Sequence, residues 1–419
     1  MSKKAKKIVL SIVAIIGVVA VFFLGFFVRE FTYSKNQRAV LNILDKYEKY
    51  YYYEDENVVD IISDAIFDKY STYLTKEEYA NVSAEASGKK RGIGVAFLSD
   101  SLEIVSVVTN SPCDKAGVKA GGTVTKISVD NVDKPFSDHE GFFDIMDGTS
   151  LGSKVKLTVN YDGKEETFEV EKQEYKRSYV TYKDATGTYN FIDDGGMKLS
   201  LRNLDCIVAD KTAYIKYEQF SGKASGTDGS VGQLKLALSK FKNDGNKNLI
   251  LDLRNNGGGY MSILSEVAGL FVEPNGSNQV VAYAKDKNSE IKKYYLKNSL
   301  YNEYEFENII VLANQNTASA SEVLIGAMLD YDSKDKVTVI LDGYKSGETT
   351  LYKTFGKGIM QTTYLNFDGS AVKVTTAQLF WPKSNVTIHN KGVTVDTSTK
   401  VKNAENGNAY EYAINLLNS

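Results

Sequence analysis

The first thirty residues are organised around one uninterrupted apolar run. Residues Ile8 to Val28 are uncharged, follow four lysines and precede Arg29 and Glu30. A run of 21 residues is long enough to cross a bilayer as a helix. A secretory signal peptide is the alternative, but its apolar core is normally shorter and ends in small residues, whereas this run ends in FFLGFFVRE. We expect residues 1–30 to form a cytoplasmic tip and one transmembrane helix, with everything after residue 30 outside the cytoplasm.

Residues 31–87 carry apolar positions at helical spacing. Val40, Leu41, Leu44 and Tyr47 form one set, and Val58, Ile61, Ile62, Ala65 and Ile66 form a second. The pattern predicts two helices, which either mediate a homodimer or pack within the monomer. The small, polar and basic residues of SAEASGKKR, 83–91, predict a linker.

The periodicity changes at about residue 88. Apolar and polar residues alternate in the segments VAFL, LEIVSVV, TVTKISV, KVKLTVNY and TFEVEK, which predicts a mostly β module over residues 88–172. From residue 173 the pattern becomes strand, turn and helix: NLILDL (248–253) precedes YMSILSEVAGLFV, and NIIVLA (308–313) precedes a second apolar helix. This succession predicts an α/β domain over residues 173–419 with its chemistry at strand ends.

Composition narrows the possible functions. The chain has 50 Lys and Arg against 53 Asp and Glu, a net charge of -3, so no long basic face is expected and nucleic acid is not a predicted partner. Cys113 and Cys206 lie far apart, fit neither a disulfide framework nor a thiolate metal site, and are predicted core residues. Only His139 and His389 are present, which leaves few candidates for chemistry that depends on histidine.

Three segments could carry chemistry. In ASASE, Ser319 stands where a buried strand becomes a helix, and the N–H of Ala320 could hold an oxyanion; the structural alternative is an S-x-x-E capping box with Glu322. In DLRNNGGG, after Asp252, the glycines 257–259 could turn amides toward a ligand or simply make a tight turn. In TFGKGIMQ, Lys357 lies between two glycines and could be a general base if burial lowers its pKa. When this segment is considered by itself, a solvated lysine in a turn is the structural alternative.

These segments occur in the order and contexts of one family, the carboxy-terminal processing (tail-specific) proteases. The chain resembles this family over about residues 60–400, through DKYSTYL from Asp68, a PDZ-like module, DLRNNGGG, TASASEVLIGAMLD and TFGKGIMQ. The resemblance implies a crotonase-like ββα core for the α/β domain and a serine endopeptidase activity without metal or cofactor. The predicted N-terminal anchor would place the PDZ and protease domains outside the cytoplasm, at the cell membrane.

The resemblance also implies residue roles. Ser319 would be the nucleophile, Lys357 the base and Gln361 the residue that orients the lysine. The oxyanion hole would use the amide of Ala320 and that of Gly258 or Gly259, between which the sequence does not decide.

The PDZ-like module implies how a substrate is chosen. It rests on RGIGVAF and SPCDKAGVKAGGTVTKISVDN. In such modules the glycine-rich loop, here Gly92, Ile93, Gly94 and Val95, offers amides to a terminal carboxylate, and the peptide pairs as an added strand. Proteins or peptides with exposed C-terminal tails are therefore the expected substrates.

Two features depart from the family pattern. Gly122 stands where an Asp is usual in these modules, and Ser319 and Lys357 are 38 positions apart, with extra residues around 332–353. The long spacing favours an alternative hypothesis, a non-catalytic PDZ scaffold that binds protein C-termini. A crotonase-type enzyme acting on acyl thioesters is a further alternative, which the extracytoplasmic location and the PDZ module disfavour. The GTSLG segment, 148–152, matches a hydrolase elbow but precedes a strand, so it is not expected to be one.

Overall fold

The computed structural model describes residues 17, 21, 33–50, 62, 63, 65–97, 101–193, 197–203, 209–223, 226, 229–405 and 407–418. The chain divides into two compact units, Met1–Ala65 and Ile66–Ser419. The first unit contains α2 (Lys35–Tyr50), which confirms the first predicted helix. Most of the second predicted helix and almost all of the predicted anchor lie outside the described residues. Within the described residues, no helix has the length and apolar character needed to span a bilayer.

The second unit begins with a short strand and a capped helix. Strand β1 (Thr72–Leu74) pairs antiparallel with β22, and α4 (Lys76–Ala86) starts at Thr75, whose side chain and that of Glu78 form a capping box. Helix α4 and strand β2 (Lys89–Gly92) leave only two residues of the predicted linker outside regular structure. The linker prediction is therefore wrong, because the small and basic residues of 83–91 end a helix and start a paired strand.

Residues 88–172 form the predicted β module, with two helices added. Its elements are β2, β3 (Val95–Phe97), β4 (Ile104–Val107), α5 (Pro112–Ala116), β5 (Thr123–Val129), β6 (Val132–Lys134), α6 (His139–Asp147), β7 (Lys154–Tyr161) and β8 (Lys164–Glu171), and β9 (Gln173–Lys176) pairs back with β2. The module has its own apolar core, in which Cys113 is fully buried as predicted. Gly148 ends α6 and the following turn leads into β7, so GTSLG joins a helix to a strand and is no hydrolase elbow.

Gly122 is required by the packing of an aromatic ring. A Cβ at this position would lie 2.4 Å from the ring of Tyr161, whose hydroxyl accepts a hydrogen bond from the Lys119 N–H. Tyr161 therefore pins this turn without the Asp that is usual there.

The α/β domain is built on an eight-stranded sheet. Its order is β12 (Met197–Asn203), β11 (Gly187–Asp193), β10 (Val180–Asp184), β13 (Thr212–Tyr217), β14 (Asn248–Asp252), β17 (Asn308–Ala313), β18 (Val337–Asp342) and β23 (Val401–Ala404). The strands from β13 to β23 run parallel. The mixed α/β fold predicted from strand, turn and helix succession is confirmed.

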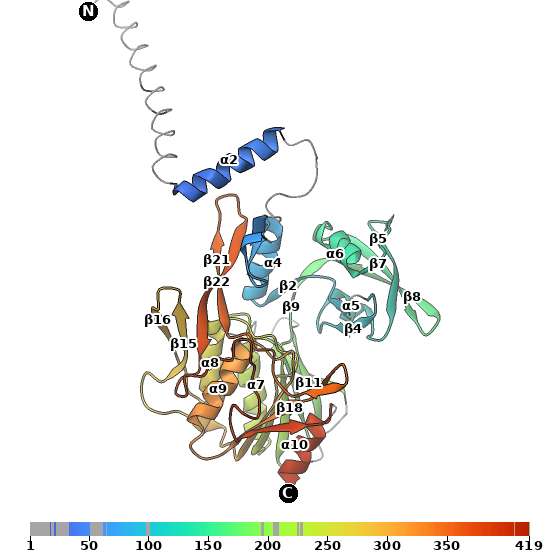
Figure 1. Cartoon of the computed structure of the whole chain (residues 1–419). Coiled ribbons are helices and arrows are strands. Elements are labelled where there is room, and N and C mark those ends of the chain that lie inside the picture. Colours follow the sequence, from blue (N-terminus) through green and yellow to red (C-terminus); the bar gives the residue numbers. More distant parts are fainter. Residues whose placement is uncertain are drawn as a thin grey trace, which may run out of the picture. The chain divides into compact units, whose positions relative to one another are not determined.

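Helices cover both faces of this sheet. The apolar core on one face includes residues of α7 (Ser230–Asn243), α8 (Met261–Phe271) and α9 (Ala320–Tyr331), and α10 (Ala409–Asn418) lies beside β18 on the other (Figure 1). Leu249 and Leu251 face the first core and Ile250 faces the second. Parallel strands buried on both faces read as continuous apolar runs, which is why NLILDL and NIIVLA were recognisable.

A second sheet and a hairpin complete the domain. Strands β1, β22 (Ala371–Phe380), β15 (Val280–Asp286) and β16 (Ile291–Tyr295) form the second sheet, and β21 (Ile359–Leu365) pairs with β22. The 3-10 helix η1 (Tyr301–Glu303) precedes β17. The extra residues between Ser319 and Lys357 contain a hairpin of β19 (Tyr344–Ser346) and β20 (Thr349–Leu351), so part of the long spacing folds into its own structure.

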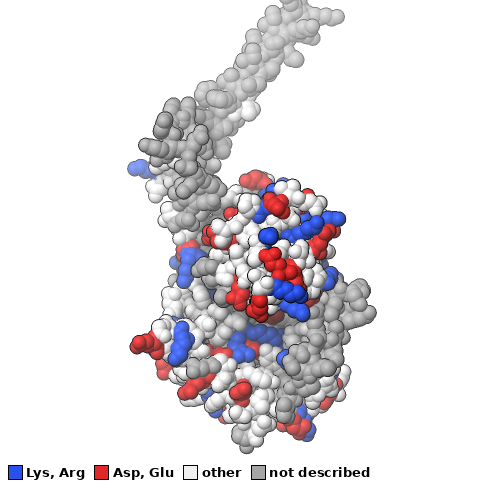
Figure 2. Space-filling model, turned by 90° about the vertical axis from the view of Figure 1, so that its right-hand side faces the viewer, with Lys and Arg blue, Asp and Glu red and all other residues white. Residues whose placement is uncertain are grey.

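Charged side chains of both signs are intermixed on the face shown in Figure 2. The coloured residues of that view form no continuous basic band. The prediction that nucleic acid is not a partner stays a prediction.

Candidate functional site

Ser319 lies in the turn that follows β17 and starts α9. Its backbone has φ 57° and ψ -118°, and its side chain is nearly buried. A residue with a side chain in this region is strained, by about 1–3 kcal/mol, and such strain is found where a side chain must be presented at a fixed angle. Ala320 is the first residue of α9, so its N–H is one of the helix amides without a partner in the preceding turn.

The glycine turn after β14 packs directly against Ser319. β14 and β17 are parallel neighbours, so their carboxyl ends meet at one edge of the sheet. Gly258 has φ +96°, and a Cβ there would lie 2.8 Å from both the Ser319 Cβ and the Ala320 N. The predicted oxyanion residues are thus brought together, and glycine is required at 258 by close approach as well as by backbone conformation.

The two predicted oxyanion glycines differ in how their amides are used. The Gly258 N–H donates to the Asn256 side chain at 2.9 Å. In the described part of the chain, the Gly259 N–H donates to no other group. Of these two described glycines, Gly259 is therefore the one whose amide is available for a ligand.

Lys357 reaches the same site from a loop between β20 and β21. The buried carboxylate of Glu322 accepts the Ser319 N–H at 2.8 Å and the Lys357 N–H at 3.0 Å. It also accepts the Gly356 N–H at 2.8 Å and the Thr354 hydroxyl at 2.5 Å. The capping-box interpretation of Ser319 and Glu322 is therefore compatible with a second role, because the same carboxylate joins the serine turn to the lysine loop.

The Lys357 amine lies in a partly buried, mixed environment. Its Nζ is 5.0 Å from the centre of the Tyr70 ring. Burial lowers the pKa of Lys357, the charge of Lys373 lowers it further, and Asp68 opposes both by raising it. Within the described residues no hydrogen bond joins the amine to the Ser319 hydroxyl. The predicted base and the predicted nucleophile thus line the same cleft, without a hydrogen bond between their side chains among the described contacts.

Gln361 lines the same cleft, but its side chain is engaged elsewhere. Its Nε2 donates to the Thr375 hydroxyl on β22 at 3.2 Å. The expected contact with Lys357 is not among the hydrogen bonds of the described residues.

Ser319, Lys357, Gln361, Gly258 and Gly259 all line one cleft of about 520 Å³. Its apolar wall includes Met261, Ile359 and Leu379. The cleft is large enough for a short stretch of extended peptide, with apolar contacts close to the serine.

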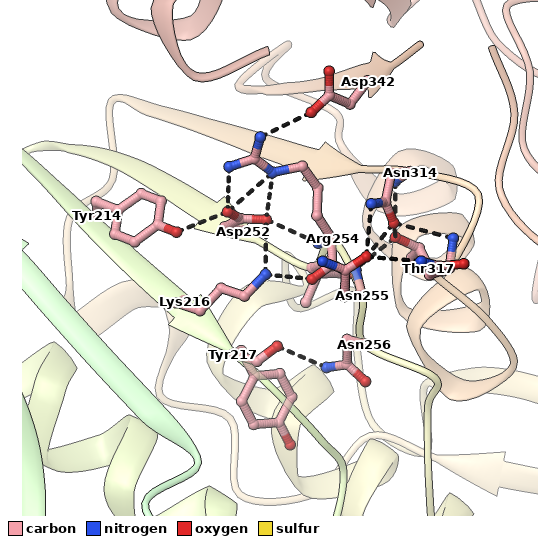
Figure 3. A network of polar contacts seen from close by, with 12 residues as sticks. Tyr214, Lys216, Tyr217, Asp252, Arg254, Asn255, Asn256, Asn314, Thr317 and Asp342 are labelled. Atoms are coloured by element: carbon pink, nitrogen blue, oxygen red, sulfur yellow. Dashed lines mark hydrogen bonds and ion pairs between the residues drawn. The ribbon is translucent and has the colours of Figure 1, made fainter. Parts of the chain in front are cut away.

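A buried charged network anchors the glycine turn to the sheet (Figure 3). Asp252, at the end of β14, accepts hydrogen bonds from the Tyr214 hydroxyl at 2.7 Å and from the Arg254 guanidinium at 2.7 to 3.1 Å. Lys216 pairs with Asp252 at 3.4 Å and donates to the Arg254 carbonyl, and Arg254 also donates to Asp342 at 2.8 Å. Burial pushes the pKa of Asp252 up, but these partners outweigh it and hold that pKa below its usual range.

The predicted peptide-binding loop lines a separate groove in the β module. Gly92, Ile93, Gly94 and Val95 lie along a cavity of about 410 Å³ whose other wall is α6. That wall presents His139, Phe142, Phe143 and Met146. β3 pairs only with β4 among the described strands, so its other edge faces this groove.

Sequence reasoning missed several residues of the site. Thr354 and Asn256 looked like ordinary turn residues, and Tyr70 lies in a segment more than 240 positions before Ser319. The resemblance of DKYSTYL to a family motif identified the segment that contains Tyr70 but implied no role for it. Within the described residues, no group of three or more His, Cys, Asp or Glu side chains is placed to hold a metal ion.

Comparison with known families agrees with this architecture. Residues 91–171 match the family model "PDZ domain", and residues 211–399 match the model "Peptidase family S41". The chain thus contains a region similar to peptidase family S41, preceded by a region similar to PDZ domains. The family predicted from the motifs is confirmed.

Individual relatives are similar over most of the chain. A "Probable CtpA-like serine protease" of Staphylococcus saprophyticus is 30% identical over 82% of this chain and 62% of its own length. One of Staphylococcus aureus with the same name is 29% identical over 92% of this chain and 70% of its own length. The chain therefore spans roughly three fifths to seven tenths of the length of these relatives. The solved structure of a photosystem II D1 C-terminal processing protease aligns with 90% of this chain and 91% of its own, at 21% identity and a TM-score of 0.49.

Proposed function

We propose that the chain is a serine endopeptidase of the carboxy-terminal processing type, which cleaves protein substrates near their C-terminal tails. The observation that carries the proposal is the shared cleft of Ser319 and Lys357, in which the lysine has a lowered pKa and the serine turn packs on the glycine turn. A lysine with a lowered pKa can be neutral near physiological pH and then accept a proton.

The proposed reaction has two halves. The neutral Lys357 amine takes the proton of the Ser319 hydroxyl while Oγ attacks the carbonyl carbon of the scissile peptide bond. The resulting oxyanion accepts hydrogen bonds from the Ala320 and Gly259 amides, the second of which we favour over Gly258 because its N–H is free. The C–N bond then breaks, the Lys357 ammonium protonates the leaving amine, and an acyl-enzyme remains on Ser319. Water attacks this ester, Lys357 accepts its proton, and the carboxylic acid product leaves with Ser319 regenerated.

The proposal requires two side-chain movements. The Lys357 amine must turn from the Tyr70 ring toward the Ser319 hydroxyl, and Gln361 must exchange its bond to Thr375 for one to the amine if it is to orient the base. Both are side-chain rotations, and catalytic hydrogen bonds are often long or unformed before substrate binds.

Substrate choice is proposed to begin in the PDZ groove. The amides of the Gly92–Val95 loop would bind a terminal carboxylate, and the tail would pair along the free edge of β3. The apolar wall of Phe142, Phe143 and Met146 favours tails that end in apolar residues. We further propose that residues 8–28 anchor the protein in the cell membrane, with both domains outside the cytoplasm and possible pairing into homodimers through residues 31–87.

The experiment is to incubate the full chain with an unstructured protein that ends in apolar residues and to identify products by mass spectrometry. We expect cleavage near the tail, and a loss of at least about 10³-fold in Ser319→Ala and in Lys357→Ala. Unchanged cleavage by either variant would remove the site assignment. Binding of the tail without any cleavage by the wild type would instead support the non-catalytic scaffold.

A further inference from the structure

Asn256 is fully buried within the glycine turn, and its side chain has a partner for each polar atom. Its Nδ2 donates to the Tyr217 carbonyl at the end of β13 at 2.9 Å (Figure 3). Its Oδ1 accepts the Gly258 N–H at 2.9 Å. The side chain therefore fixes the turn to the sheet on one side and fixes the first oxyanion glycine on the other.

The backbone of Asn256 joins the glycine turn to the serine turn. Its carbonyl accepts the Ala318 N–H at 3.0 Å and the Ser321 hydroxyl at 3.0 Å, and these two residues flank Ser319 and Ala320. The turn that would supply one oxyanion donor is thus tied to the turn that would supply the other.

The orientation of the Gly259 amide follows from the bonds of Gly258. The Gly258 carbonyl accepts the Phe220 N–H at 2.9 Å, and the described chain contains no cis peptide bond. In a trans peptide the C=O and the following N–H point in opposite directions, so the Gly259 N–H points away from Phe220. The Phe220 bond opposes a flip of the Gly258–Gly259 peptide, and the Asn256 bond to the Gly258 N–H opposes a flip of the preceding Gly257–Gly258 peptide. Both peptides that flank Gly258 are therefore held by hydrogen bonds.

We infer that Asn256 is a positioning residue for the oxyanion site: it holds the Gly257–Gly258 peptide and thereby fixes Gly258, so that the following Gly259 N–H is presented to the cleft together with the Ala320 N–H. The inference rests on the proposed function and adds to it the residue that aligns the two donors. An aspartate cannot replace it fully, since a carboxylate has no hydrogen to donate to the Tyr217 carbonyl and would place a negative charge beside the developing oxyanion.

The test compares two matched substitutions in the full chain. Asn256→Asp is the test variant. Asn246→Asp is the control, because Asn246 is also buried and its Nδ2 also donates to a tyrosine oxygen, that of Tyr182 at 3.1 Å, at a position outside the cleft. Each variant is measured for kcat and KM on the tail substrate and for inhibition by a peptide boronic acid, whose tetrahedral adduct on Ser319 places an oxygen where the oxyanion forms.

We expect both variants to lower the melting temperature, but only Asn256→Asp to lower kcat, by about 10²- to 10³-fold with KM nearly unchanged. The affinity for the boronic acid should fall by a similar factor. If kcat and boronate affinity fall no further than in the control, or if the loss is confined to KM, Asn256 has only a structural role and the inference is overturned.

Two provisions keep the test decisive. If Asn256→Asp does not fold, the smaller Asn256→Ser variant is measured in the same way, and a wild-type kcat in that variant overturns the inference. Wild-type cleavage that is lost in Ser319→Ala shows the proposed function independently of Asn256. If the wild type itself does not cleave, the proposed function fails and this inference fails with it.

Discussion

Asp252 and Glu322 are two buried carboxylates that hold the glycine turn and the serine turn, respectively, and they are stabilised in different ways. Asp252 is 1% exposed and is surrounded by cations, with Arg254 and Lys216 both paired to it. Glu322 is 0% exposed and accepts only N–H and O–H donors, three from backbone amides and one from Thr354. One carboxylate has counter-ions, and the other has a shell of neutral dipoles.

The pKa directions follow from that difference. Burial raises the pKa of both, but in Asp252 the bonds and charges of Arg254 and Lys216 overcome it and the pKa is lowered. In Glu322 burial exceeds the effect of the four hydrogen bonds, and the pKa is raised. Glu322 binds the backbone N–H of Lys357 and not its amine, so this carboxylate forms no ion pair that would keep the amine protonated. The comparison suggests that Asp252 serves stability and that Glu322 serves the alignment of the reacting groups.

The largest expected effect is the loss of stability in Asp252→Asn. The substitution leaves Arg254 and Lys216 buried with one fewer counter-charge, and breaking a buried pair in this way costs about 3–5 kcal/mol. Urea unfolding should be followed by the fluorescence of Trp381, the single tryptophan, which is buried in the core of the α/β domain. Cleavage per folded molecule should change far less than stability does.

The control for this prediction is Asp342→Asn, because Asp342 accepts only one bond from Arg254. It should lose less stability than Asp252→Asn. Since the pKa of Asp252 is lowered by folding, the stabilisation by its charge is complete above the unfolded-state pKa of about 4 and disappears as pH falls through the folded-state value. A deficit of Asp252→Asn that is as large in strong acid as at neutral pH would contradict the electrostatic account.

The second expected effect is on activity, in Glu322→Gln. A glutamine amide has one acceptor oxygen where the carboxylate has two, so its NH₂ group would face N–H donors that it cannot accept. The serine turn and the lysine loop should then separate slightly, and small misplacement of reacting groups can cost about 10²-fold in rate. We expect kcat/KM on the tail substrate to fall by about that factor.

Glu273→Gln provides the matched control for Glu322→Gln. Glu273 also accepts a backbone N–H and a hydroxyl, both from Ser333, but it lies outside the cleft. Its substitution should leave kcat/KM unchanged. Equal losses in the two variants would remove the distinction between an aligning and a stabilising carboxylate.

Much of this arrangement could be predicted from the sequence. Two apolar strands, each followed by a turn and a helix, gave the parallel sheet and placed Ser319 and the glycines at one edge, because neighbouring parallel strands end together. The alternation of apolar and polar residues in 88–172 predicted the β module, and the order of the motifs predicted the family. Gly258 could be recognised as special, since three consecutive glycines before a helix indicate an unusual backbone.

The missed features depend on contacts between distant segments. Glu322 was interpreted as a helix cap, and nothing in its local sequence shows that Thr354 and the amides of residues 356 and 357 close on it from 32 to 35 positions away. The linker prediction failed because small polar residues suit a helix end and a strand start as well as a loop. Neither Tyr70 nor Lys373 could be placed near Lys357 without the pairing of β1 and β22.

The smallest expected effect concerns the charges around the Lys357 amine. The charge of Lys373 lowers the pKa of Lys357 and that of Asp68 raises it. If the neutral amine is the base, activity rises with pH through this pKa. Lys373→Gln should therefore move the rising limb of the kcat/KM profile to higher pH, and Asp68→Asn should move it to lower pH. On that limb each change should amount to a factor of about two to ten, in opposite directions. High salt should weaken both shifts, because partly exposed charges are screened. Shifts of the same sign in the two variants would show that a group other than Lys357 controls the rising limb of the profile. The comparison of Glu322 with Asp252 would then no longer bear on the identity of the base.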